Sequence, residues 1–271
     1  MYIKTKTRTY NVKEQTLVMG ILNITPDSFS DGGNYTSIDK AIEHALEMEE
    51  QGAHIIDVGG ESTRPDHNPV SDEEEIGRVV PVIKSLKKRL SIPISIDTYK
   101  ASTAEAAIVA GAEIINDIWG AKYDPNIAKV AASYDVPIIL MHNRKNTEYD
   151  NIIEEMIMDL QESIDIARRN GVKEEQIILD PGIGFGKELR DNFHVLHHLD
   201  QISQAFPYPI LLATSRKSFI STILDIPADE RDNATGATTC VGMMKGAHMV
   251  RVHDVPRHVE LVKMMEAMLK G

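Results

Sequence analysis

The stretch Leu17-Val-Met-Gly-Ile-Leu22 is a nearly continuous apolar run of six residues. A β-strand that is covered on both faces has this pattern, because neither face meets water. Seven further runs of four to six residues repeat the pattern along the chain, and they are Ala53–Val58, Pro93–Ile96, Ala112–Ile115, Val136–Met141, Gln176–Leu179, Pro209–Ala213 and Ala247–Val252. The repetition indicates eight buried parallel strands.

Amphipathic segments separate these runs, with apolar residues at spacings of three and four that are typical of helices packed on a sheet. They include Ile38–Gln51, Asp72–Arg89, Ala101–Ala110, Ile152–Arg169, Asn192–Ala205 and Val255–Leu269. This alternation predicts an α/β fold, a (β/α)8 TIM barrel with a parallel eight-stranded core. The alternative is a doubly wound open sheet. No long linker interrupts the pattern, so we expect residues 1–271 to form a single domain.

Two kinds of segment stand outside the repeat. Residues 1–15 alternate polar and apolar side chains, which predicts a β-hairpin that closes the bottom of the barrel. Residues 25–36 and 59–71 are rich in Gly, Pro, Asp and Ser, and we expect them to be mobile loops that act as lids.

The charge and cysteine content narrow the function classes. The formal net charge of -12 argues against a nucleic-acid partner, which would require a basic face. No apolar segment reaches the length of a signal peptide or a membrane span, so we expect a cytoplasmic protein without a membrane partner. Cys240, the lone cysteine, cannot form an internal disulfide, and we expect a buried, unreactive thiol.

Polar residues follow every predicted strand, at the rim where barrel enzymes build their active sites. They are Asn23, Asp57 with Glu61, Asp97, Asn116 with Asp117, His142 with Asn143, Asp180, Arg216 with Lys217, and Arg251 with His253. A single aspartate at such a position is commonly a helix cap. Eight polar strand ends that include cations are harder to explain as caps, and they indicate an active site.

The rim residues fall into two chemical groups. Asp97, Asn116 and Asp180 offer acceptors and an amide that suit the edge of a planar heterocycle with several N–H donors. Lys217, Arg251 and His253 form a cationic arc after the last two strands, where barrels often bind phosphate. The sequence therefore predicts a nitrogen heterocycle with a phosphate tail as the substrate.

Two further patterns do not carry a site of their own. The glycines of Asp180–Lys187 are too closely spaced for a nucleotide-binding P-loop, and we expect them to let the backbone approach a flat ligand. His194, His197 and His198 lie on a predicted helix without a carboxylate or thiolate at ligand spacing, so we expect a solvated face and no metal.

Taken as whole motifs, the strand ends resemble the folate-pathway branch of the pterin-binding barrel family. The motifs are Gly20–Gly33, Asp57–Pro65, Ser95–Asp97, Asn116–Ile118, Met141 with His142, Asp180–Lys187, Ser215–Ser218 and Arg251–Asp254. The resemblance implies condensation of p-aminobenzoate with 6-hydroxymethyl-7,8-dihydropterin diphosphate, with release of diphosphate, in tetrahydrofolate biosynthesis. It also implies Mg²⁺ as cofactor and a homodimer.

The resemblance assigns roles residue by residue. The residues implied to bind pterin diphosphate are Thr63, Asp97, Asn116, Met141, Asp180, Phe185, Lys217, Arg251 and His253. Those implied to bind p-aminobenzoate are Phe29, Thr63, Arg64, Pro65, Lys217 and Ser218. The implied catalytic set is Asn23, Asp27, Lys217, Arg251 and His253, with Asn23 as the Mg²⁺ ligand. One departure is Asp66, which stands where the family's second loop usually has glycine, and it puts the geometry of that loop in question.

The implied chemistry is dissociative. Diphosphate would leave from a CH₂ group on the dihydropterin ring, and the cations of the rim would stabilise the charge that develops on it. The arylamine is neutral at cell pH, so it needs no strong base. Lids would keep water from capturing the intermediate.

The sequence leaves two alternative functions open. A methyltransferase that moves a methyl group from methyltetrahydrofolate to a corrinoid or homocysteine shares the barrel, but it should lack the Asn23–Gly33, Glu61–Pro65 and Ser215–Ser218 motifs. A non-catalytic pterin carrier would have no use for a diphosphate arc. The methionine-rich segment Met243–Met268 is either a dimer face or core helix, and core is the commoner reading.

Overall fold

Eight parallel strands form a closed barrel in the computed structural model, which describes residues 1–24, 34–62 and 69–270. The strands are β3 (Leu17–Asn23), β4 (Ile55–Gly59), β5 (Ile94–Asp97), β6 (Ile114–Asp117), β7 (Ile138–Met141), β8 (Ile177–Asp180), β9 (Leu211–Leu212) and β10 (Met249–Val252). Their order is β8-β7-β6-β5-β4-β3-β10-β9, and an isolated parallel bridge between Leu179 and Ile210 joins the two ends. The predicted (β/α)8 barrel is confirmed.

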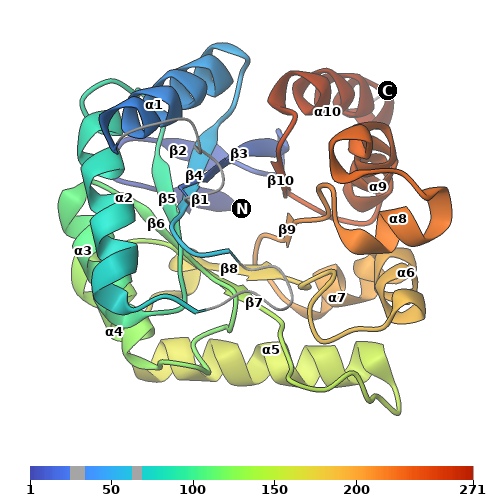
Figure 1. Cartoon of the computed structure of the whole chain (residues 1–271). Coiled ribbons are helices and arrows are strands. Elements are labelled where there is room, and N and C mark those ends of the chain that lie inside the picture. Colours follow the sequence, from blue (N-terminus) through green and yellow to red (C-terminus); the bar gives the residue numbers. More distant parts are fainter. Residues whose placement is uncertain (25–33, 63–68, 271) are drawn as a thin grey trace.

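The helices surround the strands as an outer ring (Figure 1). They are α1 (Asn34–Glu50), α2 (Asp72–Leu86), α3 (Ala101–Ala110), α4 (Asn126–Tyr134), α5 (Ile152–Arg169), α6 (Leu189–His197), α7 (Leu199–Ala205), α8 (Ser218–Leu224), α9 (Asp232–Met244) and α10 (Val255–Lys270), with 3-10 turns at Glu174–Gln176 and Ala228–Glu230. Among the described residues, no helix combines the length and apolar character that crossing a bilayer requires.

Some predicted boundaries were wrong. The segment Asn192–Ala205 is two helices, because the chain bends at His198, which has φ -110° and ψ 21°. The strand expected at Pro209–Ala213 is only two residues long. The last three residues of the predicted loop 25–36 belong to α1, while residues 25–33 lie outside the described part of the chain.

An N-terminal hairpin closes the bottom of the barrel. Strand β1 (Tyr2–Lys4) pairs antiparallel with β2 (Thr9–Asn11). Ile3 and Tyr10 are buried against the apolar side chains inside the barrel, and the Tyr10 hydroxyl donates to the carbonyl oxygen of His54 at 2.7 Å. The hairpin therefore shields the lower end of the core from water, as its alternation predicted.

The barrel interior is built in two layers of opposite character. The lower layer is apolar, and its strand residues are Leu17, Met19, Ile55, Ile114, Ile139, Ile178, Leu211 and Met249. Because side chains alternate across a strand, the residue two positions further on faces the same way. On four strands these next positions are Asp57, Asn116, Asp180 and Arg251. The packed lower layer thus supports a polar upper layer at the C-terminal rim.

The methionines of α9 and α10 divide between the core and the surface. Met243 and Met265 are buried, whereas Met244, Met264 and Met268 are each more than half exposed. The expectation that this segment is core holds for only part of it. Cys240, on α9, packs against the core but is only half-buried, so the expectation of a buried thiol is met in part.

We expect Ile55→Ala to lower the free energy of unfolding by about 3 kcal/mol, since it opens a cavity in the fully buried lower layer. Urea denaturation measures this change. Val109→Ala is the control, because Val109 is 69% exposed on α3. An equal loss for both variants would mean that the lower layer is not the core described above.

Candidate active site

Arg251, on β10, connects the ends of the neighbouring strands β4 and β5. Its Nε donates to Asp57 Oδ2 at 2.6 Å, and its Nη2 donates to Asp97 Oδ2 at 2.6 Å. Asn116 Nδ2 also donates to Asp57 Oδ2, at 3.0 Å. Asp57, Asp97 and Asn116 are all buried. The ends of β4, β5, β6 and β10 therefore meet in one hydrogen-bonded cluster.

The charges of this cluster are strongly coupled. Burial raises the pKa of Asp97 to about 7, although the Arg251 guanidinium opposes that rise. Burial alone would lower the pKa of Arg251, but Asp57 and Asp97 together hold it above its usual range. A carboxyl group whose pKa lies near neutrality in a concave rim is a functional-site candidate on physical grounds.

Acceptor atoms of the cluster point to a ligand with N–H groups. Within the described residues, Asp57 Oδ1, Asp97 Oδ1 and the Ser95 hydroxyl are buried without a hydrogen-bond partner. Buried polar atoms are normally satisfied, since an unmade hydrogen bond leaves the cost of desolvation uncompensated. These three atoms lie on β4 and β5. A heterocycle edge with several donors would satisfy them.

Asp180 forms a second acidic position, on the opposite side of the barrel at the end of β8. Its Oδ1 accepts from the backbone N–H of Gly182 at 2.7 Å. Burial raises its pKa, and the nearby Lys217 opposes the shift. Gly182 has φ +65°, and a Cβ there would lie 2.0 Å from the carbonyl oxygen of His142. Only glycine therefore lets the loop turn back over the Asp180 carboxylate.

Lys217 lies between the two acidic positions. Its Nζ is 4.7 Å from the centroid of the Phe185 ring and donates to the carbonyl oxygen of Ile183. Burial lowers the pKa of this amine to about 8, although Asp180 and Asp97 favour its charged form. The adjacent Arg216 makes a two-point ion pair with Asp232, at 2.8 and 2.7 Å. Of the two cations predicted after β9, Lys217 thus belongs to the site.

An apolar wall lies beside the polar cluster. Tyr99, Ile118 and Met141 are buried together, and Trp119 and Phe185 pack against them. Such a surface suits the face of a flat ring, while the acidic side chains suit its edge. Ile118 and Tyr99 are rim residues that the strand-end reasoning did not select.

Some of the remaining predicted site residues lie in the described part of the chain, and the others lie outside it. His253 is held by Ser215, whose hydroxyl lies 2.9 Å from His253 Nδ1 and accepts the His253 backbone N–H at 3.1 Å. Asn23 ends β3 with an exposed side chain, and Ser218 is the exposed first residue of α8. The predicted residues outside the described part of the chain are Asp27, Phe29, Thr63, Arg64, Pro65 and Asp66.

Asp57 and Lys187 belong to the site, but the sequence assigned neither of them a role, although Asp57 was predicted at the rim. Asp57 follows Ile55 by two residues, so the strand alternation contained the signal that places it inside the barrel. Lys187 gave no such signal, because its partners come from different elements.

No group of three or more His, Cys, Asp or Glu side chains in the described ranges could hold a metal ion. The ring of His198, just after α6, contacts that of His194 in a tilted arrangement and that of His197 edge-on. A resident metal cage is therefore not built from the part of the chain that the structure describes.

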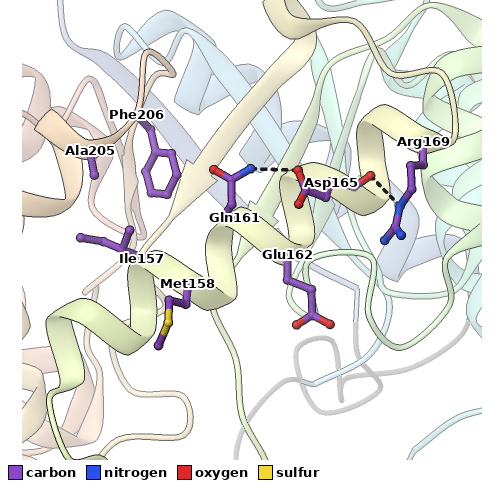
Figure 2. A pocket seen from close by; sticks show the side chains of 8 residues that line it. All are labelled: Ile157, Met158, Gln161, Glu162, Asp165, Arg169, Ala205 and Phe206. Atoms are coloured by element: carbon purple, nitrogen blue, oxygen red, sulfur yellow. Dashed lines mark hydrogen bonds between the residues drawn. The ribbon is translucent and has the colours of Figure 1, made fainter.

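A cleft also occurs on the outside of the barrel, between α5 and the end of α7 (Figure 2). Ile157, Met158 and Phe206 give it an apolar part, and Gln161 donates to Asp165 at 2.9 Å along its edge. It lies on the helical face, away from the strand ends. It lacks the buried, convergent polar groups that distinguish the rim, so we place the candidate site at the rim.

The rim is that of a barrel enzyme whose side chains form hydrogen bonds with the edge of a nitrogen heterocycle. Residues 19–253 match the family of pterin-binding enzymes. The chain belongs to this family and, within it, to the dihydropteroate synthases.

Individual relatives support that placement. The chain is 58% identical over 267 residues to a dihydropteroate synthase of Bacillus subtilis, covering 98% of this chain and 93% of the relative. A solved Clostridium difficile dihydropteroate synthase, crystallised in the presence of pteroic acid, has a TM-score of 0.94 and 48% identity, covering 97% of this chain and all of that one. A Xanthomonas albilineans dihydropteroate synthase with 4-aminobenzoic acid has a TM-score of 0.94 and 36% identity, covering 100% and 98%.

We expect pterin affinity to fall as the pH drops below about 7. The pKa of Asp97 is raised to about 7, and a ring that donates two N–H groups binds the ionised carboxylate. One pH unit below that pKa, about a tenth of the groups are ionised, so the dissociation constant should rise about tenfold. Calorimetric titration with the pterin substrate between pH 5.5 and 8 measures this.

The control is Asp97→Asn, which should bind the pterin weakly and with little pH dependence over the same range. A wild-type dissociation constant that stays flat from pH 5.5 to 8 would remove Asp97 from this role.

Proposed function

We propose that the chain condenses p-aminobenzoate with 6-hydroxymethyl-7,8-dihydropterin diphosphate, giving 7,8-dihydropteroate and diphosphate for tetrahydrofolate biosynthesis. The observation that carries the proposal is the Arg251 cluster, with its unpartnered acceptors on β4 and β5. The kinship with dihydropteroate synthases, which include structures with pteroic acid and 4-aminobenzoic acid, supports the same reaction.

The edge of the pterin ring forms hydrogen bonds with Asp97, Asn116 and Asp180. Asp97 and Asp180 accept N–H bonds, and the bond from Asn116 Nδ2 to Asp57 fixes the orientation of the amide. Met141 and Phe185 contact the ring faces from the apolar wall. Binding of the ring satisfies acceptors that would otherwise remain buried and unmade, which favours this ligand over an apolar one.

The cationic side of the rim holds the diphosphate. The C–O bond between the CH₂ group and the diphosphate breaks, and both electrons leave with the diphosphate. Positive charge then spreads over the dihydropterin nitrogens. Lys217, Arg251 and His253 stabilise the charge that develops on the leaving group, and such preorganised electrostatics is commonly the largest catalytic contribution.

The arylamine of p-aminobenzoate forms the new bond. Its nitrogen lone pair attacks the CH₂ carbon, and the amine then loses one proton to solvent. We assign its carboxylate to the exposed Ser218 beside Lys217. For Phe29, Thr63, Arg64 and Pro65 the assignment to p-aminobenzoate rests on the motif match, as does the role of Asp27 near the cation.

Mg²⁺ fits this site as a companion of the diphosphate. Asn23 is the exposed last residue of β3, and its side chain carries an amide oxygen, a hard ligand that magnesium accepts. Mg²⁺ commonly keeps several waters and binds through substrate phosphates with one or two protein ligands. A site with a single protein oxygen therefore suits it. When bound, the ion neutralises charge on the leaving diphosphate.

We also propose that the chain is a cytoplasmic homodimer made of one domain, without a nucleic-acid or membrane partner. The exposed side chains of Val241, Met244, Met264 and Met268 on α9 and α10 support an apolar contact between copies. The net charge of -12 supports the absence of a nucleic-acid partner.

Diphosphate release tests the function directly. We expect the chain to release diphosphate from the pterin substrate in the presence of Mg²⁺ and p-aminobenzoate. Lys217→Met should lower kcat/KM by about a hundredfold or more, because it removes the cation between the two acidic positions. Lys245→Met is the control, since Lys245 Nζ lies 3.1 Å from Asp200 Oδ1 in an ion pair away from the rim. No release by the wild-type chain would refute the function.

Asn23→Ala tests the magnesium assignment. We expect the variant to need more Mg²⁺ for half-maximal turnover, because it lacks the amide oxygen, with pterin binding in the absence of metal unchanged. A Mg²⁺ titration of diphosphate release measures the first quantity, and calorimetry with chelator measures the second. Identical Mg²⁺ curves for the variant and the wild type would exclude Asn23 as the ligand.

A further inference from the structure

Lys187 is a buried lysine at the foot of the glycine-rich loop that follows β8. It is 8% exposed. Its Nζ donates to the carbonyl oxygens of Gly182 and Phe185, each at 3.0 Å, and lies 2.9 Å from His142 Nδ1. An ammonium group has three N–H donors, so these three contacts use all of them.

His142 continues the connection away from the loop. Its Nε2 lies 2.9 Å from Asp159 Oδ2, and the same oxygen accepts from Arg144 Nε at 2.6 Å. Because Nδ1 accepts from Lys187, the ring proton resides on Nε2 and is donated to Asp159. Burial lowers the pKa of His142 to about 4, which keeps the imidazole neutral and able to accept. A continuous chain of polar contacts thus runs from Lys187 to α5.

The loop itself has little intrinsic rigidity. Gly182, Gly184 and Gly186 have φ values of +65°, +86° and +53°, in the left-handed region that favours glycine. Glycine loses more conformational freedom on folding than any other residue, so a loop with three glycines needs external contacts to hold one conformation. Lys187 supplies two of them, because its acceptors Gly182 and Phe185 bracket the middle of the loop.

Three functional features depend on that conformation. The N–H of Gly182 is bonded to the Asp180 carboxylate at 2.7 Å. The carbonyl of Ile183 accepts from Lys217, and the Phe185 ring lies 4.7 Å from Lys217 Nζ. Lys187 makes none of these contacts itself. Both carbonyls that it binds, however, belong to the segment 182–187, which also contains the groups that make them.

We propose that Lys187 is a positioning residue that, together with His142, fixes the glycine-rich loop so that Asp180, Phe185 and Lys217 are correctly placed for the pterin. This inference rests on the proposed function. An apolar side chain of similar length would fill the space without the desolvation penalty of an ammonium, but it would remove the Lys187 donor from the Phe185 carbonyl and from His142 Nδ1. The Gly182 carbonyl would keep only the bond from the Phe185 backbone N–H, at 3.1 Å. Burial lowers the pKa of Lys187 to about 7, although the Asp180 carboxylate favours the charged ammonium.

The test is Lys187→Met, with steady-state kinetics for both substrates and amide hydrogen exchange of the loop. We expect KM for the pterin diphosphate to rise about tenfold, as small misplacements of binding groups commonly produce losses of this size or larger. KM for p-aminobenzoate should change less than twofold. Exchange of the Gly184 and Gly186 amides should become faster, whereas exchange in the lower barrel layer should not.

Lys87→Met is the matched control. Lys87 pairs with Glu113 at 2.6 Å, and Glu113 accepts a hydrogen bond from the Thr7 backbone N–H of the N-terminal hairpin, at the other end of the barrel. It should leave both KM values and the loop exchange unchanged. If Lys187→Met does not fold, Asp159→Ala replaces it, since Asp159 is 19% exposed and its loss frees His142 Nε2. We expect a smaller change in the same direction.

The outcomes are distinguishable. An inactive wild-type chain would refute the proposed function and leave the loop-exchange result to decide the structural part. Wild-type activity with unchanged pterin KM and unchanged loop exchange in Lys187→Met would overturn the positioning role. Equal rises of both KM values, or the same changes in Lys87→Met, would also overturn it, because they would indicate a general loss of stability.

Discussion

The buried pairing of Arg251 with Asp57 and Asp97 is the interaction on which the rim depends. Two carboxylates at the ends of neighbouring strands repel one another in a medium of low polarity. The guanidinium binds one oxygen of each at 2.6 Å, which keeps both side chains inside the barrel mouth. It also leaves the second oxygen of each carboxylate without a partner among the described residues. The same ion pairs thus stabilise the rim and leave two carboxylate oxygens available to accept hydrogen bonds from a ligand.

Buried cations are paired with nearby acceptors at other positions around the rim as well. Lys217 interacts electrostatically with Asp180. Lys187 contacts His142, which in turn bonds Asp159. Lys100 donates to Glu61 and Glu75 at 2.6 and 2.9 Å. Each buried cation has a fixed set of acceptors. This arrangement lets a chain with a net charge of -12 bind an anionic substrate, because local cations rather than the total charge determine the potential at the site.

Much of the architecture was predictable because it follows from local periodicity. The helices Ala101–Ala110 and Ile152–Arg169 begin and end as predicted, and each predicted strand is present within a few residues. The errors occur where tertiary packing overrides a local pattern. The bend at His198 interrupts a stretch whose apolar spacing continues through it, and β9 shrinks to Leu211–Leu212. Periodicity records which face is buried, but it does not record where backbone pairing stops.

The sequence by itself determined the barrel, its polar strand ends and the choice of a heterocycle with an anionic tail, because these follow from alternation within a strand and from residue type. Only the tertiary structure decided which polar groups are partners. Arg251 and Asp57 are 194 residues apart, and closure of the barrel brings them to 2.6 Å. It likewise directs Arg216 toward Asp232 and gives Lys187 acceptors on two elements. Pairing of this kind depends on distances that the fold alone sets, and so no local pattern could reveal it.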